Sequence, residues 1–432
     1  MKKFKAGYIT SGIFSCMIIG FMFSAVLAVC IHAGKKIDDM LNSTEDKQEI
    51  KIDLEAMYPF ETGDMKSKRK ETIFEKMYDK LKEKCDEYSS SKLIGYYSII
   101  ESAKGYENAA GWNMASVFDY NAVVKLRDGH LTTYMPSNDI TANAKATIEL
   151  AEFCRAKGIK FFYVNAPTKI CAIEDKNISG VLDFKNQNTD RFLEMIGASG
   201  VRYYDLRKNL HEEGMNHHKS FYITDNHWRV ETALWAARHI LNFLRDDYGL
   251  NVKPEMLDPD KFNFDVYHEW FLGGHGTKAT LAGTKPEDFT FVYPKYTASI
   301  TVYEPYINGY TSGDFFVMCN MEELQEKDYY GRHTYNRMYK SHECFHIKNN
   351  LVSTGKKILM LRDSFATGLL PFMILGTQSI DAIDLRLFPG SLKSYMKANP
   401  PDILIIMYCT DMPGISSMLK VSDSQKRLYD FR

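Results

Sequence analysis

A repeated alternation of helical patterns and β-rich runs between residues 142 and 408 constrains this chain most. The helical pattern at 142–158 ends at Gly158, and the β-rich run at 159–166 stops before Pro167. Further helical patterns lie at about 190–196, 230–243, 365–375 and 391–398, and further β-rich runs lie at 201–206, 356–361, 380–386 and 402–408. Such alternation is typical of a parallel sheet with helices on both faces. The sequence therefore predicts a doubly wound α/β fold, interrupted by a small β-containing insertion at about 254–345.

The N-terminal segment is apolar and uncharged. From Gly7 to Ala33 the chain has no Asp, Glu, Lys or Arg. This uncharged run is long enough for a helix to cross about 30 Å of hydrocarbon. Lys2, Lys3 and Lys5 precede this run and favour a cytoplasmic N-terminus with an exported body. A cleaved signal peptide is the alternative, because residues 26–28 (VLA) resemble a cleavage site. We expect residues 1–33 to be an uncleaved, single-pass membrane anchor.

The rest of the chain divides by composition. Residues 34–119 are expected to form a stalk and a helical entry segment, 120–415 the catalytic domain and 416–432 a C-terminal tail. The formal net charge of −1 and the lack of a basic block with interleaved aromatics do not point to nucleic acid, so no nucleic-acid partner is expected. The eight cysteines show no disulfide framework or zinc-ligand spacing.

A serine follows a predicted strand, at a position where parallel sheets commonly carry functional residues. Residues 362–365 (RDSF) follow the β-rich run at 356–361 and precede a predicted helix. Open parallel sheets bind ligands at the carboxyl ends of their strands. Ser364 at such a turn would be exposed, with backbone N–H groups available to stabilise an oxyanion. The alternative is that Asp363 or Ser364 only caps the helix.

A carboxylate and an imidazole lie two residues apart before the helix at 230–243. In an extended stretch, residues i and i+2 project to the same side, so Asp225 and His227 can reach one site. A serine nucleophile requires a base of this kind, with the carboxylate orienting the imidazole. Two further Asp–His spacings occur, in the glycine-containing turn at 128–130 and at 265–268.

One motif points to a different chemistry. Residues 342–346 (HECFH) fit the H-E-x-x-H pattern, which on a helix places two zinc ligands and a general base. No Glu follows Glu343 to complete such a site, and the segment is a mediocre helix former. A zinc metallopeptidase is therefore the least favoured alternative. The histidines at 211, 217 and 218 are expected to lie in a solvated turn.

Several segments taken together resemble a known family. They are residues 166–169 (APTK), 224–228 (TDNHW), 271–274 (FLGG) and 355–365 (GKKILMLRDSF). These segments resemble the DHHW family of exported, SGNH-hydrolase-like proteins related to the alginate O-acetyltransferases of exopolysaccharide systems. The resemblance covers roughly residues 120–415.

The resemblance implies roles for particular residues. Ser364 would be the nucleophile, His227 the general base and Asp225 the group that orients it. Arg362, Arg386 and Tyr408 would be candidate contacts to an oxyanion or to substrate, although packing or ion-pair roles are equally open for Arg386 and Tyr408. Two positions depart from the pattern: Asn226 replaces the first His of the family motif, and Arg362 stands where Gly often precedes the serine. No metal and no organic cofactor is implied.

The resemblance also implies a reaction and partners. The expected function is an exported O-acyltransferase, acting on a cell-surface or secreted polysaccharide through an acyl-serine. Because acetyl-CoA is cytoplasmic, a polytopic membrane-bound O-acyltransferase would relay the acyl group. A carbohydrate acetylesterase of the same fold and a non-catalytic polysaccharide-binding component are the alternatives.

Overall fold

The computed structural model describes residues 123–171, 183–304, 309–340, 344–415 and 427–432. They belong to one compact unit, Cys85–Arg432. The expected anchor, stalk and entry segment lie outside the described residues. Within the part that is described, no helix has both the length and the apolar character needed to cross a membrane.

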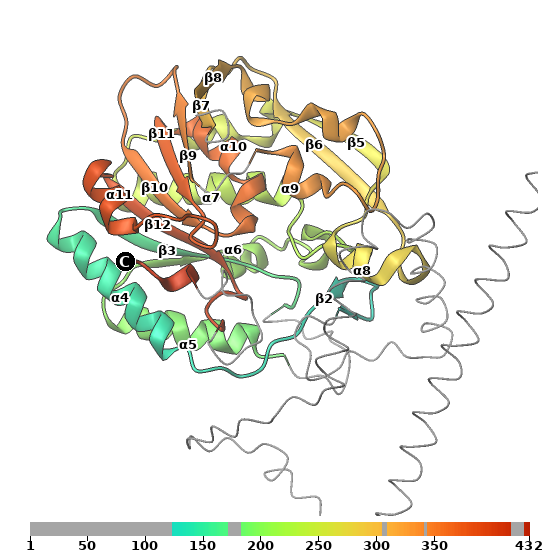
Figure 1. The fold of residues 1–432 in the computed structure, drawn as a ribbon, viewed down its shortest axis with the longest axis horizontal. Helices are drawn as coiled ribbons and strands as arrows, with labels where there is room; N and C mark the ends of the chain where they lie inside the picture. Colours follow the sequence, from blue (N-terminus) through green and yellow to red (C-terminus); the bar gives the residue numbers. More distant parts are fainter. Residues whose placement is uncertain (1–122, 172–182, 305–308, 341–343, 416–426) are drawn as a thin grey trace, which may run out of the picture. The chain divides into compact units, whose positions relative to one another are not determined.

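An eight-stranded sheet forms the centre of the described chain, in the order β4-β3-β12-β10-β11-β9-β7-β8 (Figure 1). Its strands are β3 (Lys160–Ala166), β4 (Tyr203–Asp205), β7 (Ile300–Glu304), β8 (Gly309–Gly313), β9 (Cys344–Asn349), β10 (Lys357–Arg362), β11 (Ser379–Ile383) and β12 (Ile403–Cys409). The five strands from β4 to β11 are parallel, whereas β9, β7 and β8 pair antiparallel. The sheet is therefore mostly parallel, as predicted. Within the predicted insertion, β7 and β8 extend the sheet, and β9 begins in its last two residues.

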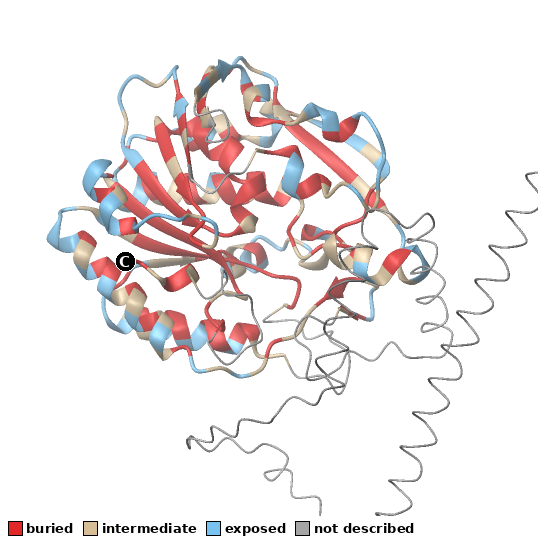
Figure 2. Cartoon of the chain, in the orientation of Figure 1, coloured by how far each residue is buried: buried red, intermediate tan, exposed pale blue. Residues whose placement is uncertain are grey.

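Helices cover both faces of this sheet. They are α4 (Thr141–Ala156), α5 (Lys185–Ala198), α6 (Leu206–Glu212), α7 (Val230–Tyr248), α10 (Leu370–Met373) and α11 (Leu392–Ala398). Ile358 and Met360 of β10 pack in one buried cluster with α7 and α10, and Leu359 and Leu361 pack in the other with α4, α5 and α11. Figure 2 shows the buried strands between these two layers. This alternation is the reason that β10 reads as a continuous apolar run.

The helix expected at 365–375 is broken into three short pieces. A 3₁₀ turn η7 (Ser364–Gly368), α10 and a second 3₁₀ turn η8 (Ile374–Gly376) take its place. Pro371 lies in the first turn of α10, which suits a residue that has no N–H to donate and fixes its own φ. The chain therefore restarts its helix here instead of continuing it.

Two further segments lie in the predicted insertion and at the C-terminal end. A long antiparallel hairpin, β5 (Phe262–Phe271) with β6 (Glu287–Pro294), forms its own two-stranded sheet, and α8 (Gly274–Gly283) lies between its strands in sequence. Residues 427–432, expected as a tail, place Leu428 in the core beside α4 and α5. The remaining elements are β1 (Val124–Lys125), β2 (Leu131–Thr132), α9 (Thr334–Met338) and the 3₁₀ turns η1 (His218–Ser220), η2 (Pro254–Leu257), η3 (Pro259–Lys261), η5 (Phe315–Met318), η6 (Met321–Leu324) and η9 (Arg427–Tyr429).

Candidate active site

The loop between η1 and α7 turns Asp225 and His227 toward one point. Phe221 and Trp228 close the loop as an antiparallel bridge, and the Tyr222 N–H donates to the His227 carbonyl at 3.2 Å. Inside the loop, the His227 N–H donates to Asp225 Oδ1 at 3.1 Å. Both side chains are buried. The spacing of two residues therefore brings them together, through a tight turn and not through an extended strand.

A carboxylate from the β5–β6 hairpin fixes this loop. Glu287 accepts hydrogen bonds from the Ile223 N–H at 2.8 Å, the Thr224 N–H at 2.7 Å and the Thr224 hydroxyl at 2.6 Å. Burial raises the pKa of Glu287 above its ordinary value, and Arg229 lies 3.2 Å from it. Thr224 Oγ1 also accepts from the Gly273 N–H at 2.9 Å. The hairpin predicted as a small insertion thus helps to hold the site.

Ser364 begins η7 directly after β10, and it is half-buried. Both carboxylate oxygens of the preceding Asp363 accept hydrogen bonds. Oδ1 accepts from the Phe365 N–H at 2.8 Å, and Oδ2 accepts from the Cys409 N–H at 2.7 Å. Burial raises the pKa of Asp363. The capping role considered from the sequence therefore belongs to Asp363, while the Ser364 side chain faces His227.

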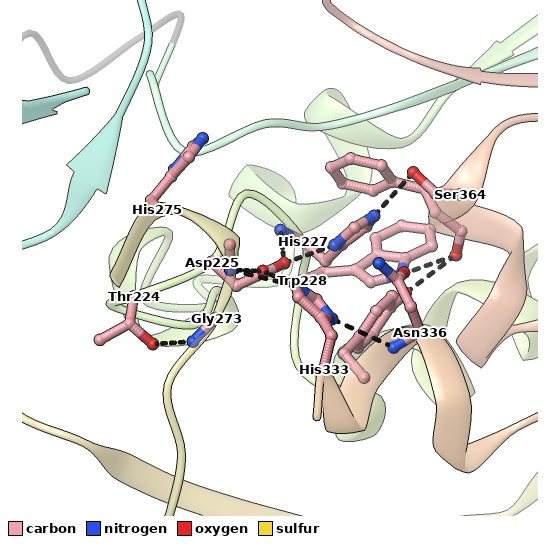
Figure 3. A network of polar contacts seen from close by, with 12 residues as sticks. Thr224, Asp225, His227, Trp228, Gly273, His275, His333, Asn336 and Ser364 are labelled. Carbon is pink, nitrogen blue, oxygen red and sulfur yellow. Dashed lines mark hydrogen bonds and ion pairs between the residues drawn. The ribbon is translucent and has the colours of Figure 1, made fainter. Parts of the chain in front are cut away.

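These three side chains form a continuous series of hydrogen bonds (Figure 3). His227 Nε2 lies 2.7 Å from Ser364 Oγ, and His227 Nδ1 is bonded to Asp225 Oδ1. The imidazole stacks on the Tyr335 ring, with centroids 4.2 Å apart, and it packs against Phe365. An imidazole held in this way can accept the serine proton while the carboxylate stabilises the resulting positive charge.

A second histidine contacts the same carboxylate, and no sequence motif identifies it. His333, at the start of α9, places Nε2 2.7 Å from Asp225 Oδ2, and the Gly274 N–H donates to the same oxygen at 2.7 Å. Burial alone would raise the pKa of Asp225, but the charges and hydrogen bonds of His227 and His333 hold it well below its ordinary value. Asp225 therefore stays ionised in the folded protein.

The three other candidate site residues bind different partners. Arg362 is buried on β10 with Nη1 3.4 Å from Asp384 Oδ2, and Arg386 forms two hydrogen bonds to the Asp384 carboxylate at 2.9 and 2.7 Å. The Tyr408 hydroxyl donates to the Leu428 carbonyl at 2.7 Å. Tyr408 packs in the cluster beside α4 and α5, whereas Phe365 packs in the opposite one. These contacts give the three residues ion-pair and packing roles.

The alternative Asp–His pair on β5 does not come together. The Asp265 carboxylate accepts from the Tyr293 hydroxyl at 3.0 Å, whereas the His268 side chain is 80% exposed and lies 3.0 Å from Asp288. The described part of the zinc motif, residues 344–346, forms a strand and not the required helix. His346 lies in strand β9 and pairs with Asp381, while residues 342 and 343 lie outside the described part. The peptidase alternative is therefore wrong about the local structure at His346.

A comparison with family models supports the resemblance read from the motifs. The model described as "SGNH hydrolase-like domain, acetyltransferase AlgX" matches residues 127–268. This span contains Asp225 and His227, and Ser364 lies beyond it. The predicted resemblance is thus confirmed. No curated protein sequence matches the chain.

Solved structures share the fold at low sequence identity. Bacillus cereus PatB1 superposes with a TM-score of 0.56 and 15% identity, covering 72% of this chain and 99% of that one. PatB1 with a sulfonyl adduct gives a TM-score of 0.55 and 17% identity, covering 71% and 99%. A DHHW family protein from Eubacterium siraeum gives 0.54 and 16%, covering 73% and 96%. These similarities show that the chain shares the fold of these proteins.

Proposed function

We propose that this chain is a serine-dependent O-acyltransferase that transfers an acetyl group to a hydroxyl of a polysaccharide outside the cytoplasm. The observation that carries the proposal is the hydrogen-bonded series from Ser364 through His227 to Asp225. The AlgX-type family model over residues 127–268 supports acyl transfer as the reaction class.

The geometry suits a reaction with two half-steps. In the first, Ser364 Oγ attacks the carbonyl carbon of the acyl donor while His227 Nε2 takes the hydroxyl proton. The tetrahedral intermediate collapses, the proton passes to the leaving group, and an acyl-serine remains. In the second, His227 takes the proton of the acceptor hydroxyl, whose oxygen attacks the acyl carbon. Ser364 Oγ then leaves and regains its proton.

The two carboxylate oxygens of Asp225 have separate tasks in this scheme. Oδ1 binds His227 Nδ1 and stabilises the imidazolium that forms in each half-step. Oδ2 is held by the Gly274 amide and His333, so the carboxylate keeps its orientation as the charge on His227 changes. The lowered pKa of Asp225 keeps it from taking the proton itself.

The donor belongs to the proposal as well. With residues 7–33 as a membrane anchor, the site would lie outside the cytoplasm, where acetyl-CoA is absent. A polytopic membrane-bound O-acyltransferase would then supply the acetyl group.

Covalent trapping and variants test the serine chemistry. A sulfonyl fluoride should label the full-length protein, and peptide mapping should place the adduct on Ser364. Ser364→Ala, His227→Ala and Asp225→Ala should each abolish turnover of a chromogenic acetyl ester, and any double variant should be no worse than Ser364→Ala because the three act as a unit. An adduct elsewhere, or an active Ser364→Ala, would refute the nucleophile.

Acetyl transfer is distinguished from ester hydrolysis by adding oligosaccharide acceptors to the assay. With a panel of oligosaccharides, the acetyl group should appear on sugar, seen as a mass increase of one acetyl unit that Ser364→Ala does not produce. Rapid release of acetate from acetylated polysaccharide, without transfer to any acceptor, would make the protein an acetylesterase. Tight binding of an oligosaccharide with neither reaction would make it a non-catalytic component.

A further inference from the structure

Three potential metal ligands from separate parts of the sequence converge beside the candidate active site. Asp128 and His130 lie in the turn between β1 and β2, and His218 opens η1. Their ligand atoms lie within 4.8 Å of one another. His130 Nδ1 lies 3.1 Å from Asp128 Oδ2, and His218 Nδ1 contacts the same oxygen. We propose that these side chains form a binding site for a divalent transition metal, and that Zn²⁺ is the ion that suits it.

The turn that carries Asp128 and His130 is built to present both side chains. Gly129 adopts φ +94°, a conformation that residues with a side chain rarely adopt. The Gly129 N–H donates to the Leu126 carbonyl at 2.9 Å, and the Leu126 N–H donates to the His130 carbonyl at 2.7 Å. The His130 N–H donates a hydrogen bond to Asp128 Oδ1 at 3.1 Å. The other carboxylate oxygen, Oδ2, is the one that faces both imidazoles.

The separation between His130 and Asp128 suits a tetrahedral ion. With Zn–N and Zn–O bonds of about 2.1 Å, neighbouring ligand atoms lie about 3.4 Å apart. The 3.1 Å between His130 Nδ1 and Asp128 Oδ2 is close to this value, and all three ligand atoms lie within 4.8 Å of one another, so side-chain rotations would bring the set around one ion. Two imidazoles and one carboxylate leave the fourth position for a water molecule.

The two histidines of the cluster are largely buried, whereas the aspartate is partly exposed. The side chains of His130 and His218 are only 10% and 14% exposed, whereas that of Asp128 is 38% exposed. An ion and its water can therefore enter past the carboxylate, while the two rings are fixed by packing. The neighbouring His217 is held separately, with Nε2 2.8 Å from the Thr168 carbonyl oxygen.

The cluster lies next to the triad loop without touching the triad. His218 precedes Phe221, where the loop begins, and the Leu131 N–H after the β1–β2 turn donates to the Ile223 carbonyl at 2.8 Å. A bound ion would tie the β1–β2 turn to the start of this loop. Its role would be to position the loop, so the serine chemistry itself needs no metal. The inference is independent of the proposed acyl transfer.

Metal binding to the full-length protein tests the site directly. Chelator-stripped protein in mild detergent is titrated with Zn²⁺ by calorimetry, and bound zinc is counted by elemental analysis. We expect one tightly bound Zn²⁺ per chain, with affinity at least tenfold weaker in His218→Ala and Asp128→Asn. His346→Ala is the matched control, because His346 also pairs with an aspartate, Asp381, and it should bind as wild type does.

Substitution by Co²⁺ distinguishes this site from the cysteines. The absorption spectrum should show nitrogen and oxygen ligands with no thiolate charge-transfer band. Thermal unfolding of metal-free His218→Ala should match that of metal-free wild type, which shows that the variant folds. The proposal is overturned by a lack of stoichiometric binding, by binding that survives both variants, by loss in His346→Ala, or by a thiolate spectrum.

Discussion

The approach of Gly273 to Asp225 gives a sharp test of how the site is positioned. A Cβ at Gly273 would lie 2.3 Å from Asp225 Cβ, 2.6 Å from its Oδ2 and 2.8 Å from its Cα. Gly273 has φ −72°, so alanine meets no backbone strain. Any loss of function in Gly273→Ala would therefore come from displacement of the aspartate.

The size of the displacement follows from these distances. Ordinary contact begins at 3.4 Å, so the two residues must separate by 3.4 − 2.3 = 1.1 Å. The obstructing atoms include the backbone of Asp225, so rotation of a flexible side chain cannot relieve the clash. A misplacement of about 1 Å costs on the order of 10²-fold in rate, and overpacking costs roughly 1–3 kcal/mol of stability.

Gly274→Ala is the matched control. A Cβ there would meet His333 Nε2 at 3.4 Å and Asp225 Oδ2 at 3.6 Å, which are ordinary contacts, and its N–H can still donate to Asp225. We expect about 10²-fold lower kcat/KM for Gly273→Ala and a change of a few-fold at most for Gly274→Ala. The assay is chromogenic ester turnover, normalised to the folded fraction from urea unfolding. Equal rates for the two variants, close to wild type, would show that this approach does not set the position of Asp225.

The remaining predictions concern His333, the alternative pair and topology. Burial alone would lower the pKa of His333, but Asp225 raises it, so protonation adds stability that is full below about pH 6.5 and is lost as the pH rises through the raised pKa. His333→Gln should therefore lower the free energy of unfolding more at about pH 6 than at about pH 9, and an equal loss at both would contradict this linkage. Asp265→Ala combined with His268→Ala should keep ester turnover within about threefold, since surface substitutions have small effects; an inactive protein would return that pair to consideration. Protease added to intact spheroplasts should digest the body and spare an N-terminal tag, whereas a protected body would place it in the cytoplasm.

Local sequence patterns predicted much of the fold. The helix expected at 142–158 is α4, and its stop at Gly158 agrees with a glycine at φ +71°. The helix expected at 230–243 continues to Tyr248 because Gly249, at φ +61°, supplies the left-handed cap. The broken helix after Ser364 was missed because its apolar residues fit both arrangements, and Gly368 and Pro371 were the local signals against a continuous helix.

The sequence by itself determined which residues could do chemistry. A two-residue Asp–His spacing and a serine after a buried strand are local features, and local geometry follows from a few neighbouring residues. Tertiary structure alone decided that β12, the last strand in sequence, lies between β3 and β10, and that His333 and Tyr335 support the triad. It also brought His218 to Asp128 and His130. The histidine contacts join residues about 90 to 110 positions apart. All of these contacts depend on how buried faces pack against one another, and that packing energy is summed over the whole core and is not encoded by local spacing.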